Sequence, residues 1–143
     1  MSATLDITET PSAADTKAVL DGLVAFNDAV MGGPAGKRPL AVLLRDEAGH
    51  AVGGAIGASW YGWMYVELFH IPQSFRGRGE GRRIMQAVEA EARARGLLGI
   101  RLDTFSFQAP GFYERLGFTR IGTIEDHPPG HARHWYVKRL GEG

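Results

Sequence analysis

The sequence predicts an α/β (α+β) protein in which a mixed central sheet of six to seven strands is flanked by about three to four helices. Short apolar runs bounded by turn residues predict the strands. One strongly amphipathic segment, residues 79–95, lies between two of these runs and predicts a crossover helix that joins two parallel strands. A chain of 143 residues can bury a core of its own, so we expect a single domain over residues 1–143.

The N-terminal part is predicted to hold a short strand and then a helix. Residues 5–8 predict the first strand. Asp15 and Thr16 can cap a helix that runs to about Asn27. The apolar face of this helix consists of Val19, Leu20, Leu23, Val24 and Phe26. Glycines and prolines in residues 31–39 predict that a loop follows.

Further along the chain, strands alternate with two helices. The central strand covers residues 63–71 and ends at Pro72. The crossover helix ends at Gly96 and buries one stripe, which consists of Ile84, Met85, Val88 and Ala92. The other predicted elements are strands over residues 40–45, 51–60, 98–103, 118–124 and 134–140, and a short helix over residues 110–116.

Charge and composition narrow the class of function. The 16 basic and 16 acidic residues balance, so bulk charge favours neither a nucleic acid nor a membrane surface as partner. The chain has no cysteine, which excludes disulfides and thiol chemistry. The uncharged stretch over residues 48–66 is interrupted by glycines and predicts buried strands, not a membrane span. The N-terminus lacks a signal-peptide pattern, and we expect a cytoplasmic protein.

A glycine-rich turn joins the central strand to the crossover helix. It reads Arg76-Gly77-Arg78-Gly79-Glu80-Gly81. Such a turn presents free backbone N–H groups at the positive end of the helix dipole, which suits an anion and above all a diphosphate. An ordinary strand-to-helix turn and an unstructured RNA-binding segment are the alternatives for these residues taken alone.

Two sequence blocks carry a family resemblance. The strand end and turn over residues 71–81 match Arg-x-x-Gly-x-Gly/Ala, and Tyr113-Glu114-Arg115-Leu116-Gly117-Phe118 matches Tyr-x-x-x-Gly-Phe. In this order they resemble the GNAT superfamily of acyl-CoA-dependent N-acyltransferases. The resemblance covers roughly residues 51–140, and residues 102–131 are similar to a narrower group of small bacterial GNAT proteins.

The resemblance implies acetyl-CoA as the acyl donor and assigns roles to residues. The backbone of the glycine-rich turn would bind the CoA diphosphate. The backbone of the Phe69, His70 and Ile71 segment would pair with the pantetheine amides, while the His70 side chain is expected to be packed or on the surface. Tyr113 would protonate the leaving thiolate. Ser106 stands seven residues earlier, where the family often has an Asn that contacts pantetheine.

The base that accepts the amine proton is expected to be Glu67. Strand alternation would place Tyr65, Glu67, Phe69 and Ile71 on one side of the sheet. A carboxylate in so apolar a strand is costly to bury without a purpose or a partner. The alternative is that Glu67 forms an ion pair with Arg101 on a neighbouring strand.

Four residues are candidates for contacting the acceptor, namely Asn27, Trp60, Asp103 and His131. Trp60, with Tyr61 and Trp63, could hold a cation against its ring or be a core or dimer-contact aromatic. His127, His131 and His134 have spacings that allow zinc, but Pro128-Pro129-Gly130 breaks the helix that would align them, so no metal is expected.

These observations predict an acetyl-CoA-dependent N-acetyltransferase that acts on a small-molecule amine by direct attack on the thioester. The alternatives are acetylation of a protein or peptide amine, and a CoA-binding regulatory module without turnover. The sequence leaves open the acceptor, the acyl-chain preference and whether the protein is a homodimer.

Overall fold

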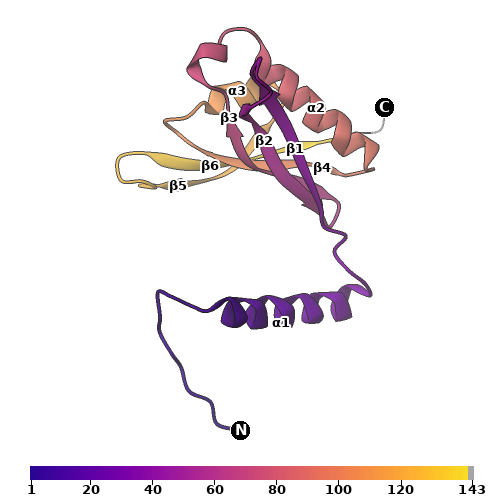
Figure 1. The fold of residues 1–143 in the computed structure, drawn as a ribbon, viewed down its shortest axis with the longest axis vertical. Helices are drawn as coiled ribbons and strands as arrows, with labels where there is room; N and C mark the ends of the chain where they lie inside the picture. Colours follow the sequence, from indigo (N-terminus) through magenta and orange to yellow (C-terminus); the bar gives the residue numbers. More distant parts are fainter. Residues whose placement is uncertain (142–143) are drawn as a thin grey trace. The chain divides into compact units, whose positions relative to one another are not determined.

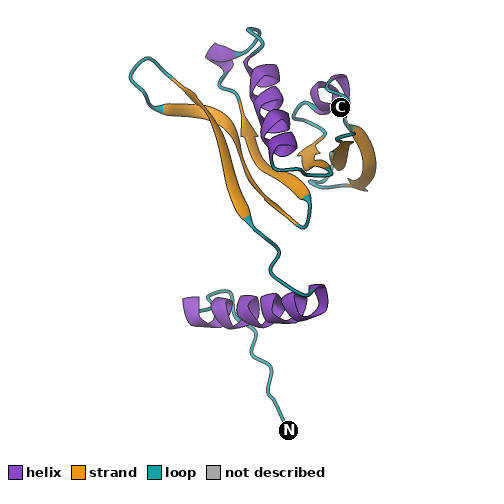
Figure 2. Cartoon of the chain, turned by 90° about the vertical axis from the view of Figure 1, so that its right-hand side faces the viewer, coloured by secondary structure: helices purple, strands orange, loops and turns teal. Residues whose placement is uncertain are grey.

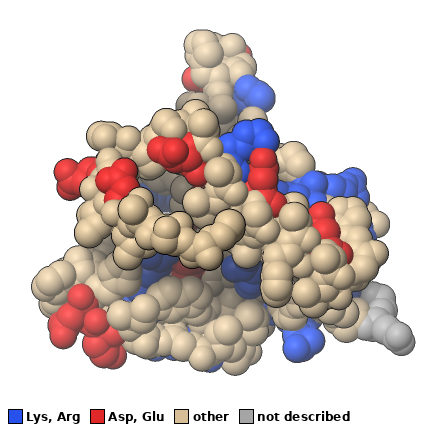
Figure 3. All heavy atoms as spheres, turned by 90° about the horizontal axis from the view of Figure 1, so that it is seen from below, with Lys and Arg blue, Asp and Glu red and all other residues tan. Residues whose placement is uncertain are grey.

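The computed structural model describes residues 1–141 of the chain. These residues fall into two compact units, the first Met1–Ala35 and the second beginning at Gly36. Each unit is described by itself. None of the helices in the described part of the chain has the length and apolar character needed to cross a membrane. Figure 3 shows basic and acidic side chains together on one face, in keeping with the balanced composition.

The first unit contains one helix, α1 (Ala13–Met31), drawn in indigo in Figure 1. Ser12 caps it, because the Ser12 hydroxyl accepts from the Asp15 N–H and the Asp15 side chain accepts from the Ser12 N–H. The helix therefore starts earlier than predicted, and it ends at Gly32 in the left-handed conformation. The strand predicted over residues 5–8 is wrong. Four residues need a neighbouring strand to form a ladder, and this unit contains none.

The second unit is built on a six-stranded sheet with the strand order β1-β2-β3-β4-β6-β5. The predicted mixed α/β fold is confirmed. All neighbouring strands are antiparallel except β3 and β4, which are parallel, as the single crossover helix predicts. The strands are β1 (Arg38–Arg45), β2 (Ala51–Trp60), β3 (Trp63–His70), β4 (Gly99–Phe105), β5 (Thr119–Glu125) and β6 (Ala132–Arg139).

The helical elements of this unit are the short 3-10 helix η1 (Gln73–Phe75), α2 (Glu80–Ala94) and α3 (Pro110–Arg115). Figure 2 shows α2 lying along one face of the sheet. The predicted stripe of α2 is confirmed, since its buried residues are Ile84, Met85, Val88 and Ala92. They pack against strand residues of the same core, which include Met64, Val66, Ile100, Leu102 and Tyr136.

The opposite side of β3, β4 and β6 carries polar and aromatic side chains, and we call it the open face. Buried and partly exposed residues alternate along β4 and β6, and the partly exposed ones lie on this side of the sheet. The open face includes Trp63, Tyr65, Arg101, Asp103, Arg133, Trp135 and Val137.

A β-bulge interrupts this alternation in β3. Gly57 pairs with Val66 but Ile56 pairs with Leu68, so Glu67 is the extra residue. Phe69 and Ile71 consequently pack with the core on the α2 side, whereas Glu67 is exposed. The predicted placement of Glu67, Phe69 and Ile71 on one side is therefore wrong, because alternation predicts a strand without a bulge.

Next to the bulge, β3 and β4 separate. Their pairing ends at Val66 and Leu102, although β3 continues to His70 and β4 to Phe105. The β4-facing backbone groups of residues 68–70 are thus left without a ladder partner from β4.

Candidate active site

The glycine-rich turn forms a cradle of backbone N–H groups. Gly77 and Gly79 have φ of +76° and +77°, a conformation that disfavours any residue with a Cβ. Gly79 caps α2 without a side-chain hydrogen bond. The N–H of Arg76 donates to a backbone oxygen, and so does the N–H of Arg83, which lies 3.0 Å from the Gly79 oxygen. Within the described residues, the N–H groups of the positions between Arg76 and Arg83 have no backbone acceptor, so they are free to bind an anion at the start of the helix.

The arginines of this turn are partly engaged within the protein. Arg76 Nε donates to the Ile71 oxygen at 2.9 Å and so closes the turn. Arg83 pairs with Glu80 at 2.8 Å, and the Arg78 guanidinium lies 5.9 Å from the centre of the Phe75 ring. The N–H groups of the backbone are therefore the main donors of the cradle. A Cβ at Gly77 or Gly79 would meet nothing within 4 Å, so a diphosphate has room to approach.

The separation of β3 and β4 fits an extended amide-containing arm. The free backbone groups of residues 68–70 can pair with such an arm as a neighbouring strand would. Ser106, the predicted pantetheine contact, also ties the chain together. Its N–H donates to the Ala132 oxygen at 2.8 Å, and its hydroxyl accepts from the Ala132 N–H at 2.9 Å. The hydroxyl proton of Ser106 is still able to donate to a ligand.

Tyr113 is buried on α3, with 6 % of its surface exposed. Its ring packs at the edges of Phe69, Phe112 and Phe118, with ring centres 5.1 to 6.0 Å apart. Burial raises the pKa of Tyr113 to about 12, and the charge of Asp103 adds to this effect. The hydroxyl therefore keeps its proton at neutral pH, as a general acid requires.

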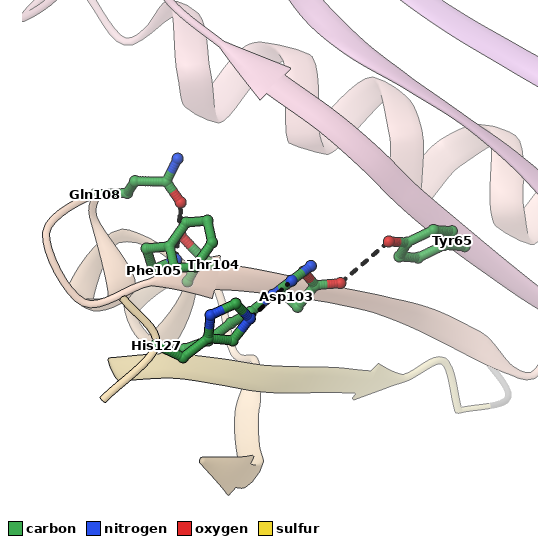
Figure 4. A network of polar contacts seen from close by, with 7 residues as sticks. Tyr65, Asp103, Thr104, Phe105, Gln108 and His127 are labelled. Atoms are coloured by element: carbon green, nitrogen blue, oxygen red, sulfur yellow. Dashed lines mark hydrogen bonds and ion pairs between the residues drawn. The ribbon is translucent and has the colours of Figure 1, made fainter. Parts of the chain in front are cut away.

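Asp103 lies at the centre of a polar network on the open face (Figure 4). The Tyr65 hydroxyl donates to one carboxylate oxygen at 3.1 Å, and Arg133 Nε donates to the other at 2.8 Å. Arg133 also lies 3.4 Å from Nε2 of His127. Burial raises the pKa of Tyr65, and Asp103 raises it further. Tyr65 thus stays a donor, and the side chain of Asp103 lies between two donors.

Sequence reasoning singled out Asp103 but missed its partner, Arg133. The two residues are 30 positions apart in the chain and meet because β6 pairs with β4. Alternation over residues 132–139 was the available signal, since it places Arg133 and Trp135 on one side of the last strand, which was predicted to begin only at His134.

Trp60 is surrounded by cations that belong to the chain itself. Its ring centre lies 5.0 Å from the Arg101 guanidinium and 5.5 Å from Lys37 Nζ. Arg101 also stacks on Tyr65 at 4.3 Å. A cation was one of the two roles open to the aromatic cluster, and two cations of the protein itself lie against Trp60.

The remaining predicted residues are dispersed. Glu67 and His70 are exposed, and no ion pair of the described residues joins Glu67 to Arg101. His131 is exposed with its ring at the edge of Phe107, 5.2 Å away. Asn27 lies on α1, in the first unit, and its role stays a prediction. Residues 1–141 contain no cluster of three His, Asp or Glu side chains that could hold a metal ion.

Comparison with known proteins agrees with this arrangement. Residues 9–118 match the Acetyltransferase (GNAT) family. The chain belongs to the acetyltransferase (GNAT) family. An acetyltransferase of Agrobacterium fabrum is 38 % identical over 124 residues, which cover 87 % of this chain and 90 % of the relative. A blasticidin-S acetyltransferase of Streptomyces morookaense is 40 % identical over 95 residues, which cover 66 % of this chain and 70 % of that protein.

Among solved structures, a protein of Agrobacterium tumefaciens that is described as an acetyltransferase superposes with a TM-score of 0.91. It is 35 % identical, and the match covers 96 % of this chain and 100 % of that one. Family membership makes this GNAT protein an N-acetyltransferase whose acyl donor is acetyl-CoA. The cradle at residues 76–81 and the opening between β3 and β4 offer the two kinds of contact that this donor requires.

Proposed function

We propose that the enzyme transfers the acetyl group to the amine of a small molecule, by direct attack of the amine on the thioester. The observation that carries the proposal is Tyr113. A tyrosine with a pKa of about 12, packed against Phe69 of the strand that borders the opening, is suited to protonate a departing thiolate. The donor would lie with its diphosphate on the N–H groups of residues 76–81 and its amide arm along residues 69–71. The family match over residues 9–118 crosses from one unit into the other, which supports treating the chain as one functional domain.

A small acceptor is favoured by the relatives. The Streptomyces morookaense relative is named for blasticidin-S, a single defined compound. The open face also offers a hollow of limited size whose charged lining residue is an arginine, which suits a small molecule better than a basic peptide.

The amine must lose a proton before it attacks. Making an alkyl amine of pKa near 10.4 neutral at pH 7 costs about 4.6 kcal/mol. Glu67 is the proposed acceptor of this proton. As the extra residue of the bulge it is exposed, and the described residues provide it with no ion pair. Asp103 is less suited, because Arg133 and Tyr65 already occupy its two oxygens.

The test is the Tyr113→Phe variant, assayed with acetyl-CoA and a panel of small amines. We expect kcat to fall by about 100-fold, the loss typical of a missing general acid, while calorimetry shows unchanged acetyl-CoA affinity. Tyr136→Phe is the matched control. It removes another buried hydroxyl, one that contacts Arg120 and Glu114 instead of the opening, and should keep its activity. Equal turnover by Tyr113→Phe and wild type would remove Tyr113 from the mechanism.

A further inference from the structure

The open face contains a hollow of about 230 Å³ near the start of β3 and β4. It is lined by Trp60, Tyr61, Trp63, Arg101 and Val137. Three aromatic rings and one guanidinium thus surround it. Aromatic walls with a few well-placed polar groups are typical of small-molecule sites.

Arg101 is the charged group of this hollow, and it lacks a counterion. Its guanidinium lies beside two rings that are perpendicular to each other, 5.0 Å from the centre of Trp60 and 4.3 Å from that of Tyr65. The side chain is partly buried, and within residues 1–141 it makes neither a hydrogen bond nor an ion pair. The ring contacts occupy none of its N–H groups, and these match a carboxylate in a bidentate fashion.

The neighbouring charges make the hollow more positive still. Lys37 Nζ lies 5.5 Å from the centre of the Trp60 ring, which Arg101 also contacts. The Arg139 guanidinium lies 5.2 Å from the centre of the Trp63 ring. Asp103, the acid nearest to Arg101 along β4, is paired with Arg133. The lining of the hollow contains no acid, so an anion that enters it meets several cations.

We infer that this hollow binds a carboxylate of the acceptor, so that the substrate is an amino acid-like amine instead of a simple alkylamine. The inference rests on the proposed function. Arg101 and Asp103 stand two residues apart on the same side of β4, which separates them by about 6.6 Å. Asp103 lies close enough to Tyr113 to raise its pKa. An acceptor whose carboxylate binds Arg101 can therefore place its amine near Asp103 and Tyr113 only if several bonds separate the carboxylate from the amine.

Acetylation of 6-aminohexanoate and of 6-aminohexanamide tests this inference, because the two amines differ only in the charged end. We expect the wild type to prefer the carboxylate by about tenfold or more in kcat/KM, the effect of one charge-assisted contact. Arg101→Gln should abolish the preference through KM, and Arg101→Lys should restore part of it. Arg139→Gln is the matched control for the loss of a nearby charge. Arg139 also lies against a tryptophan but does not line the hollow, so the preference should fall much less than in Arg101→Gln.

A second measurement separates this inference from the proposed function. Calorimetric titration of the CoA-saturated protein with hexanoate needs no turnover. Binding of hexanoate but not of hexanamide, lost in Arg101→Gln, would establish the carboxylate site even if no amine is acetylated. If amines are acetylated without any preference for the carboxylate and hexanoate does not bind, the inference is wrong while the proposed function stands. Melting curves of each variant verify that it is folded.

Discussion

Tyr113 owes its chemical state to its surroundings. The aromatic rings of Phe69, Phe112 and Phe118 exclude water from it, and Asp103 contributes a negative charge nearby. Both effects disfavour the tyrosinate. A donor that stays protonated well above neutral pH can serve in every catalytic cycle without depending on a small change in pH.

The raised pKa of Tyr113 also links stability to pH. The folded-state pKa of about 12 exceeds the usual value of 10.0, so the folded protein holds this proton more tightly than the unfolded chain does. The resulting stability is complete below pH 10 and is lost as the pH rises toward 12. Compared with Tyr113→Phe, the wild type should lose about 1.4 kcal/mol of unfolding free energy between pH 9 and pH 11.

Urea titrations of both proteins at the two pH values measure this difference. Ionisation of other tyrosines, lysines and arginines cancels, because both proteins contain them. A difference in unfolding free energy that does not change with pH would show that Tyr113 ionises as easily in the folded state as in the unfolded chain.

Two local irregularities, the bulge and the glycine-rich turn, adapt the strand-helix-strand element for binding. The bulge is possible because Gly57 stands opposite it. A Cβ at this position would lie 1.9 Å from the Tyr65 oxygen. The turn needs Gly77 and Gly79 because both residues adopt positive φ. Glycine at these positions therefore determines where the backbone offers free hydrogen-bonding groups.

Gly79→Ala tests the turn. A left-handed alanine is strained by about 1 to 2 kcal/mol, and relief of that strain would turn the N–H groups away from a bound diphosphate. We expect the unfolding free energy to fall by about 1 kcal/mol and the Kd of acetyl-CoA to rise by about tenfold. Calorimetry measures the affinity.

Gly49→Ala provides the comparison for this variant. Gly49 has φ of +84° and an open Cβ position in the turn between β1 and β2, as open as that of Gly79. It should lose similar stability but bind acetyl-CoA as the wild type does. Unchanged affinity in Gly79→Ala would mean that the diphosphate binds elsewhere.

At the scale of the second unit, Arg95 joins the helix layer to the edge of the sheet. Its side chain is 7 % exposed and forms an ion pair with Glu91 at 3.0 Å. It donates to the backbone oxygens of Arg38 and Pro39 and to the Ser59 hydroxyl, each at 3.0 Å. The end of α2 is thereby fixed to the first residues of β1 and the end of β2.

Arg95→Met should lower the unfolding free energy by about 1 to 3 kcal/mol, because the buried Ser59 hydroxyl and the backbone oxygens of Arg38 and Pro39 lose their donor. Arg93→Met is the control. Arg93 is 43 % exposed and 3.8 Å from Glu89, and its loss should change stability by no more than about 0.5 kcal/mol. Chemical denaturation measures both. Similar stabilities of the two variants would show that Arg95 does not hold the layers together.

The sequence predicted those parts of the molecule that depend on local patterns. Periodicity and glycine placement predict the α2 stripe, the positions of all six strands and the parallel crossover. The bulge at Glu67 was missed because it depends on Gly57 of another strand. The Asp103–Arg133 pair was missed because strand order, not spacing in the chain, brings the two residues together. Ligand binding by the predicted site residues stays a prediction.

The two halves of the site come from separate parts of the sequence. The backbone contacts proposed for the donor lie in one continuous stretch, residues 69–81, to which Ser106 and Tyr113 add their side chains. Those proposed for the acceptor are side chains at every second position of β4 and β6, whose intervening neighbours fill the core. Substitutions on the open face can therefore alter the range of accepted amines while the donor half and the interior stay intact. Such a protein can evolve new specificities one side chain at a time.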